Sequence, residues 1–176
     1  MSATTRNRMI GLAIAAIIFL IDQAVKHYLV MTAKLHSVQV IEILPFFDLR
    51  WTRNYGVSLG LLTAQSSEMR WLLVALTGAI ALVVLVWMLR EKRFSDIFGL
   101  SLVLGGALGN IRDRATNGFV IDYADLHFGS FRPFLIFNIA DAAITIGVLI
   151  ILARSLLSRE KRDPEQAETA KTAPES

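Results

Sequence analysis

The sequence contains no cysteine, only four prolines and few charged residues, which make up 19% of its 176 residues. The absence of cysteine excludes a disulfide framework, a thiol nucleophile and any cysteine-ligated zinc or iron–sulfur site. The net charge of +3, from 18 basic and 15 acidic residues, is too balanced to predict a nucleic-acid partner. Apolar residues are abundant instead, at 54% of the chain, and they gather in a few runs as in membrane proteins.

Long apolar runs predict membrane spans, because a helix needs about 20 mostly apolar residues to cross a hydrocarbon core about 30 Å thick. Four stretches qualify, at residues 9–30, 69–89, 94–110 and 135–152. The first follows two arginines as in a signal peptide, but no small-residue cleavage site comes after it, so we interpret it as a retained span. We therefore predict an all-α membrane protein with four transmembrane helices.

Basic residues indicate how these spans are oriented. They precede the first span, fill the turn at 90–93 between the second and third spans, and follow the fourth span. Because basic loops stay in the cytoplasm, both termini are expected to be cytoplasmic. The segments 31–68 and 111–134 then lie on the outer side, although they also carry some basic residues.

We expect one membrane domain over residues 1–155, for which a monomer is sufficient. In the first outer segment, apolar and polar side chains alternate over residues 38–43, which predicts a small β-rich segment on the membrane surface. Residues 156–176 are charged and nearly free of large apolar side chains, which predicts a disordered cytoplasmic tail.

Polar residues inside the spans are the candidates for function, because ionisable groups are costly at membrane depth. Asp22 and Lys26 are four residues apart, on one face of the first helix. They can therefore pair and offset the cost of each other's burial. We interpret them as a structural ion pair near the outer end of the helix rather than as catalytic groups.

Residues 56–60 match the G-x-S-x-G pattern of a serine nucleophile elbow. That motif needs a strand-to-helix turn in an α/β sheet and a base later in the chain, but no βα alternation occurs and only His127 follows. We favour a turn in which glycine lets the backbone come close to a span or a substrate, with Asn54 as a polar contact.

The outer end of the third span combines small and polar residues. Gly105 and Gly109 are four residues apart, a spacing typical of close helix packing. Packing does not explain Asn110 or the charged residues that follow it. Among these, Arg114 can donate in a fork to a carboxylate or a lipid phosphate.

Asp141 is the least expected residue, because it sits in an apolar span about 9 Å from the span's predicted start at residue 135. No basic residue lies within one helical turn of it in the sequence, so a partner must come from elsewhere in the fold. Asp122 is the best candidate, and two carboxyl groups that meet would share a proton, as in aspartic proteases. The structural alternative makes Asp141 a helix-packing hydrogen-bonder and Asp122 a solvated loop residue.

Other chemistries fit the sequence less well. No H-E-x-x-H motif or nucleotide-binding glycine loop is present, and we expect no metal or cofactor. Asp113, Asp122 and Asp125 invite comparison with the CDP-alcohol phosphatidyltransferases. Of the motif that characterises that family, only Gly118-x-x-x-Asp122 matches. A proton-coupled transporter would need repeats and broken helices that we do not find, and a scaffold protein would not need so many polar residues at one depth.

The ordered set of motifs resembles the lipoprotein signal peptidase (signal peptidase II) family of bacteria, from Ile10 to about Leu152. Each motif alone is weak, whereas their joint occurrence on four spans is specific. The motifs are Asp22-x-x-x-Lys26, Asn54-x-Gly56-x-x-x-Gly60, Gly105-Gly106-Ala107-Leu108-Gly109-Asn110-x-x-Asp113-Arg114, Gly118-x-Val120-x-Asp122-Tyr123 and Phe137-Asn138-x-Ala140-Asp141.

The resemblance implies a multi-pass aspartic endopeptidase of the bacterial cytoplasmic (inner) membrane. Such an enzyme removes the signal peptide of diacylglyceryl-modified prolipoproteins just before the lipidated cysteine, near the periplasmic face. Asp122 and Asp141 would be the catalytic dyad. The expected substrate-binding or supporting residues are Asn54, Gly56, Asn110, Arg114, Asn138, Asp22 and Lys26. Leu59 departs from the family, which commonly has Phe there.

Overall fold

Four long helices form a bundle in the computed structural model, which describes residues 2–56 and 67–160. The part of the chain described there holds four helices long and apolar enough to cross a membrane. They are α1 (Ala3–Met31), α3 (Ser67–Arg90), α4 (Phe94–Asn117) and α5 (Ile139–Glu160). The prediction of four spans is confirmed.

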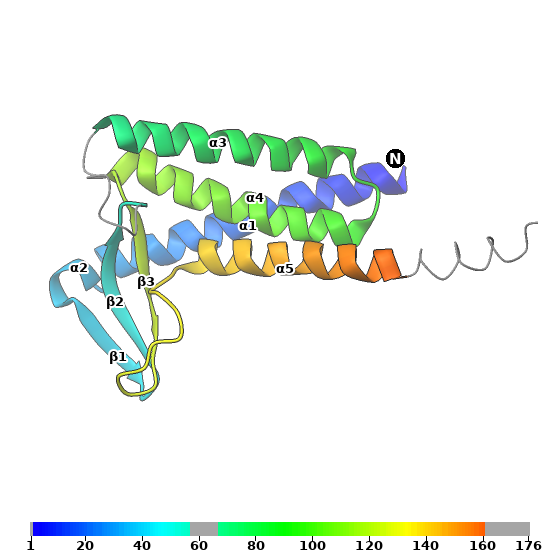
Figure 1. The fold of residues 1–176 in the computed structure, drawn as a ribbon. Helices are drawn as coiled ribbons and strands as arrows, with labels where there is room; N and C mark the ends of the chain where they lie inside the picture. The colour runs from blue at the N-terminus through cyan, green and yellow to red at the C-terminus, as the bar shows by residue number, and fades with distance from the viewer. Residues whose placement is uncertain (1, 57–66, 161–176) are drawn as a thin grey trace, which may run out of the picture.

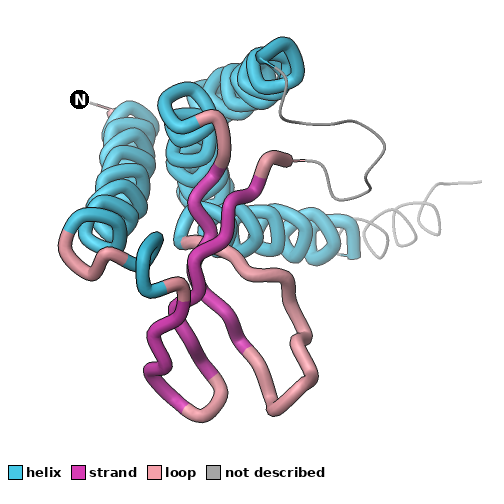
Figure 2. Tube along the Cα trace, turned by 90° about the vertical axis from the view of Figure 1, so that its left-hand side faces the viewer, coloured by secondary structure: helices cyan, strands magenta, loops and turns pink. Residues whose placement is uncertain are grey.

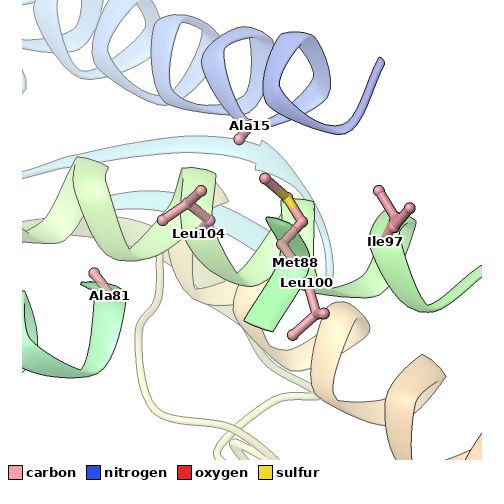
Figure 3. Packing of buried hydrophobic residues seen from close by; sticks show 6 residues of the cluster. All are labelled: Ala15, Ala81, Met88, Ile97, Leu100 and Leu104. Atoms are coloured by element: carbon pink, nitrogen blue, oxygen red, sulfur yellow. The ribbon is translucent and has the colours of Figure 1, made fainter. Parts of the chain in front are cut away.

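Helix α4 lies in the middle of the bundle, and α1, α3 and α5 each pack mainly against it. Figure 3 shows one such contact, where Met88 of α3 and Leu104 of α4 meet Ala15 of α1 in a buried apolar cluster. Close packing also needs glycine, since a Cβ at Gly105 would lie 2.5 Å from the carbonyl oxygen of Ala15. One at Gly109 would lie 2.6 Å from Asp22 Oδ2, so the predicted packing role of both glycines is confirmed.

A three-stranded antiparallel sheet covers one end of the bundle, and the N-terminus and the end of α5 lie at the opposite end (Figures 1 and 2). Its strands are β1 (Val40–Leu44), β2 (Phe47–Asn54) and β3 (Val120–Leu126), in that order, and a short helix α2 (Leu35–Val38) precedes them. The predicted β-rich segment between the first two spans is confirmed. The third strand was not predicted, because its residues are almost all buried and show no alternation of polar and apolar side chains.

Several helix ends differ from the predicted ones. Helix α1 begins at Ala3, where Ser2 caps it by accepting the Thr5 N–H, rather than at residue 9. Helix α4 continues to Asn117 instead of residue 110, because polar groups of the protein satisfy its polar last turns. It ends at Gly118, whose φ of +85° suits a helix C-cap.

Helix α5 begins at Ile139 rather than at residue 135. Asp141 therefore lies in the first turn, and the predicted depth of about 9 Å is wrong. The same helix runs to Glu160, so residues 156–160 are not part of a disordered tail. The Ser58 and Leu59 positions and the predicted tail from 161 onwards lie outside the described residues.

Candidate active site

Asp122 and Asp141 come together at the sheet end of the bundle, the first from β3 and the second from the first turn of α5. Asn138, just before α5, contacts both carboxylates. Its side-chain Nδ2 donates to Asp122 Oδ1 over 2.7 Å, and its backbone N–H donates to Asp141 Oδ2 over 3.2 Å. The two carboxylates therefore lie on either side of one residue.

The start of α5 explains why Asp141 is held so firmly. Asn138 is its N-cap, because its Oδ1 accepts the backbone N–H of Asp141 over 2.9 Å. Asp141 reciprocates with its own carboxylate, so the two residues form a capping box. One local motif thus begins the helix and orients the carboxylate.

Amide groups surround the rest of the pair. Asn110 of α4 donates from Nδ2 to Asp141 Oδ1 over 2.8 Å, and Asn54 of β2 donates to Asp122 Oδ2 over 2.9 Å. With the two bonds from Asn138, each of the four carboxylate oxygens accepts at least one N–H. Such neutral donors hold a carboxylate in place without neutralising its charge.

Burial, and after it the nearby charge of Asp141, raise the pKa of Asp122 to about 6. The hydrogen bonds from Asn54 and Asn138 oppose this effect, because they stabilise the ionised form. The Asp122 carboxyl is only 2% exposed, so burial is the natural dominant cause. A pair of this kind can hold one proton close to neutral pH.

Arg114 of α4 brings a positive charge to the same place. Its Nε is buried and has no hydrogen-bond partner in the part of the chain that the structure describes. A Cβ added at Gly56 would lie 3.6 Å from this Nε, so the glycine leaves room beside the guanidinium. Gly56 has a φ of +88°, and Asn54 Oδ1 accepts its N–H over 2.8 Å. The turn thus leaves the Arg114 guanidinium next to Gly56, where the charges of Asp141 and Asp122 act on it.

Lys26 lies beneath the aspartate pair in an ion cluster. Its ammonium is 2.9 Å from Asp22 and 2.8 Å from Asp113, and it reaches Asn110 Oδ1 at 3.5 Å. The predicted pairing of Asp22 with Lys26 is confirmed. Asp113 was missed as the second partner, because the sequence does not show that α1 and α4 touch at this level.

An apolar cavity of about 310 Å³ opens beside Asp141, between the start of α5 and the loop before it. Asp141 and Thr145 are its polar members. The other lining residues are Phe134, Leu135, Phe137, Ala142 and Ile146. The aspartate pair is therefore next to a space suited to an apolar group.

Comparison with known proteins identifies the family. The model of the family described as signal peptidase (SPase) II matches residues 14–157. The chain belongs to the signal peptidase II family. It is therefore a peptidase, and its apolar helices make it a membrane peptidase.

Similar proteins support this membership. The peptidase is 51% identical to a lipoprotein signal peptidase of Rhizorhabdus wittichii, over 93% of this chain and 95% of the relative. It is 49% identical to one of Sphingopyxis alaskensis, over 91% of this chain and 92% of the relative. A solved bacterial membrane enzyme is 30% identical with a TM-score of 0.71, covering 83% of this chain and 92% of its own. A second, 26% identical with a TM-score of 0.70, covers 94% and 93%.

The predicted site residues of this signal peptidase II family member gather in two layers. Around the aspartate pair lie Asn54, Gly56, Asn110, Arg114 and Asn138. Asp22 and Lys26 form the layer beneath and reach the pair through its neighbours.

The three aspartates compared with the CDP-alcohol phosphatidyltransferases do not share a site. Asp113 faces Lys26, Asp122 faces amides, and Asp125 pairs with Arg50 at 2.8 Å and Arg132 at 3.0 Å. Burial raises the pKa of Asp125, but the two guanidiniums outweigh it and leave that pKa lowered. Among the described residues, no group of three or more acidic or histidine side chains is arranged to hold a metal ion.

Proposed function

We propose that this peptidase is an aspartic endopeptidase that removes the signal peptide of diacylglyceryl-modified prolipoproteins, cleaving just before the lipidated cysteine. The observation that carries the proposal is the pair of buried Asp122 and half-buried Asp141, whose four oxygens are all held by N–H donors. The names of the similar proteins from Rhizorhabdus wittichii and Sphingopyxis alaskensis support the substrate class.

In the proposed reaction, Asp141 is the base and Asp122 holds the shared proton. Asp141 takes a proton from a water molecule, whose oxygen attacks the scissile carbonyl carbon, while Asp122 gives its proton to the carbonyl oxygen. The C–N bond then breaks, the leaving amine takes up the proton that Asp141 removed, and a hydroxyl of the gem-diol intermediate returns a proton to Asp122 as the new carboxyl group forms. The raised pKa of Asp122, about 6, suits the proton donor, and the N–H groups on Asp141 suit an ionised base.

The surroundings of the pair supply candidate substrate contacts. Arg114, whose buried Nε has no described partner, is placed to donate to a carbonyl oxygen of the bound substrate. Asn54 and Gly56 would line the same part of the site, and the apolar cavity beside Asp141 suits an apolar part of the substrate. No cofactor is required by this chemistry.

We further propose the orientation in the bacterial inner membrane. The basic turn between α3 and α4 and both described chain ends lie away from the sheet (Figure 1), and basic loops stay in the cytoplasm. The sheet end, with the aspartate pair, would then face the periplasm. Membrane lipids would surround the helices.

The test uses purified enzyme and a synthetic lipidated prolipopeptide. Asp122→Asn and Asp141→Asn are each expected to lower kcat at least 10³-fold while the protein stays folded, because either change removes one half of the proton exchange. Normal cleavage by either variant would overturn the aspartate mechanism. A matched control is Asp125→Asn, three positions along the same strand, where activity should stay within severalfold.

Two further measurements define the substrate and the chemistry. The same peptide without its diacylglyceryl group should not be cleaved, and equal cleavage of both peptides would reject the proposed substrate class. Activity should be unchanged in EDTA, whereas its loss would point to a metal mechanism.

A further inference from the structure

Three charged side chains are almost completely buried beneath the aspartate pair. Asp22 is 0%, Lys26 2% and Asp113 1% exposed, and the ammonium lies between the two carboxylates. A cluster with two negative charges and one positive charge costs desolvation energy, and apolar side chains of similar size often serve stability as well. Its presence therefore needs a reason besides stability.

Each carboxylate of this cluster also accepts a backbone N–H. Asp22 Oδ1 accepts the N–H of Ala140 over 3.1 Å, and Asp113 Oδ2 accepts the N–H of Ile121 over 3.2 Å. Ala140 immediately precedes Asp141, and Ile121 immediately precedes Asp122. The cluster thus holds the backbone N–H of the residue just before each member of the pair, once from α1 and once from α4.

Packing of α5 itself against β3 contributes little to the distance between the Ala140 and Ile121 backbones. Among the described residues, β3 and α5 pack mainly against other elements rather than against each other. Asn138 links the two carboxylates at their tips, but it is itself positioned by the same segments. Backbone bonds do join the two segments beyond the pair, where Phe137 and Ala124 exchange N–H···O=C bonds. The residues just before the two aspartates are held separately, by the carboxylates of the cluster.

We infer that Asp22, Lys26 and Asp113 form a positioning brace that, together with the backbone bonds between Phe137 and Ala124, fixes the separation of Asp122 and Asp141. The shared ammonium joins the two carboxylates, and each carboxylate holds the backbone of one aspartate. Lys26 also approaches Asn110 Oδ1, whose amide donates to Asp141. This inference rests on the proposed function, in which the separation of the pair governs proton sharing.

The test compares variants that differ only in a hydrogen-bond acceptor. Asp113→Asn and Asp113→Leu remove the same charge, but only the asparagine keeps an oxygen for the Ile121 N–H. We expect kcat within about fivefold of wild type for Asp113→Asn, and a loss of about 100-fold for Asp113→Leu with KM changed less than threefold. The same contrast is expected between Asp22→Asn and Asp22→Leu, which probes the Ala140 N–H.

The pH profile separates positioning from simple destabilisation. The charge of Asp141 helps to raise the pKa of Asp122, and Lys26 and Arg114 are the positive groups that act on it. A larger separation of Asp122 and Asp141 weakens the effect of the Asp141 charge on the pKa of Asp122. The pH above which kcat falls should therefore be lower in Asp113→Leu than in Asp113→Asn. Arg154→Met, which breaks the ion pair with Asp96 at the other end of α4 and α5, should lower the Tm without moving this pH.

A double-mutant cycle tests whether Lys26 acts through its partner. If it does, Lys26→Met combined with Asp113→Leu should lose no more activity than the worse single variant. All rates are normalised to folded protein. Equal kcat and equal pH profiles for the asparagine and leucine variants at either aspartate would overturn the brace, as would additive losses in the cycle. Failure of the proposed function would instead appear in the wild type, which would not cleave the lipidated peptide.

Discussion

Asn138 has more than one task in the site, and each depends on a different atom. Its Nδ2 donates to Asp122, its Oδ1 accepts the N–H of Asp141, and its backbone N–H donates to the Asp141 carboxylate. The same side chain also donates to the Ile121 carbonyl oxygen over 3.3 Å. A single small amide therefore ties the helix start, the strand and both carboxylates together.

The buried carboxyl of Asp122 should cost folding stability at neutral pH. Its pKa of about 6 is above the ordinary value of 3.8, so the folded state opposes ionisation. This cost is absent below pH 3.8, grows as the pH rises to about 6 and is then constant at about 3 kcal/mol, from 1.36 kcal/mol per unit. Asp122→Asn should therefore raise the Tm in detergent more at pH 8 than at pH 4. An equal change in Tm at both pH values would contradict this.

The amide of Asn54 should set the pH range of activity. Its hydrogen bond stabilises the ionised form of Asp122 and lowers that pKa. Asn54→Ala should therefore move the fall of kcat to higher pH, which a pH–rate profile with the lipidated peptide measures. Thr52→Val, on the same strand and opposite Asp122 in the sheet register, is the control and should leave the profile in place. A profile that moves to lower pH would show that Asn54 acts differently.

At the scale of the helices, glycine decides how closely α4 can approach its neighbours. A Cβ at Gly106 would clash with the carbonyl oxygen of Ala140, whereas one at Gly78 on α3 would meet nothing within 4 Å. Gly106→Ala should therefore lower the stability by about 1–3 kcal/mol. Gly78→Ala should raise it by about 0.5–1 kcal/mol, because alanine favours the helix. Thermal unfolding in detergent measures both, and changes of the same sign would contradict the packing described.

Much of the helical architecture could be predicted from the sequence, because long apolar runs report directly on membrane spans. The start of α5 could not be predicted, since the apolar residues before Asn138 continue the run without forming helix. The extension of α4 was missed for the opposite reason. Its last turns are polar, and only the fold shows that Asp113 pairs with Lys26 and that Asn110 donates to Asp141.

The candidate site was partly visible for a similar reason. Asp141 stood out because a carboxylate in an apolar run demands a partner, and the structure brings Asp122 beside it. Asp113 did not stand out, because it follows other polar residues at the end of a span. Periodicity says which residues share a helix face, but it does not say which helices meet.

For the whole molecule, the proposed orientation can be tested because the chain has no cysteine of its own. Two single-cysteine variants serve as probes. Ser130→Cys places a thiol in the exposed loop before α5, and Lys92→Cys places one in the exposed turn between α3 and α4. A membrane-impermeant maleimide should label the first in intact spheroplasts and the second only after lysis, since basic turns remain inside. The reverse pattern of labelling would reject the orientation.

The order of the helices in the chain has a consequence for synthesis. Helix α1 brings Asp22 and Lys26, and α4 brings Asn110 and Asp113, but Asn138 and Asp141 are made last. Until α5 enters the bilayer, Asp122 lacks both its partner carboxylate and one of its two amide donors. The proposed enzyme is therefore inactive until α5 has been synthesised, and the insertion of α5 into the membrane also completes the active site.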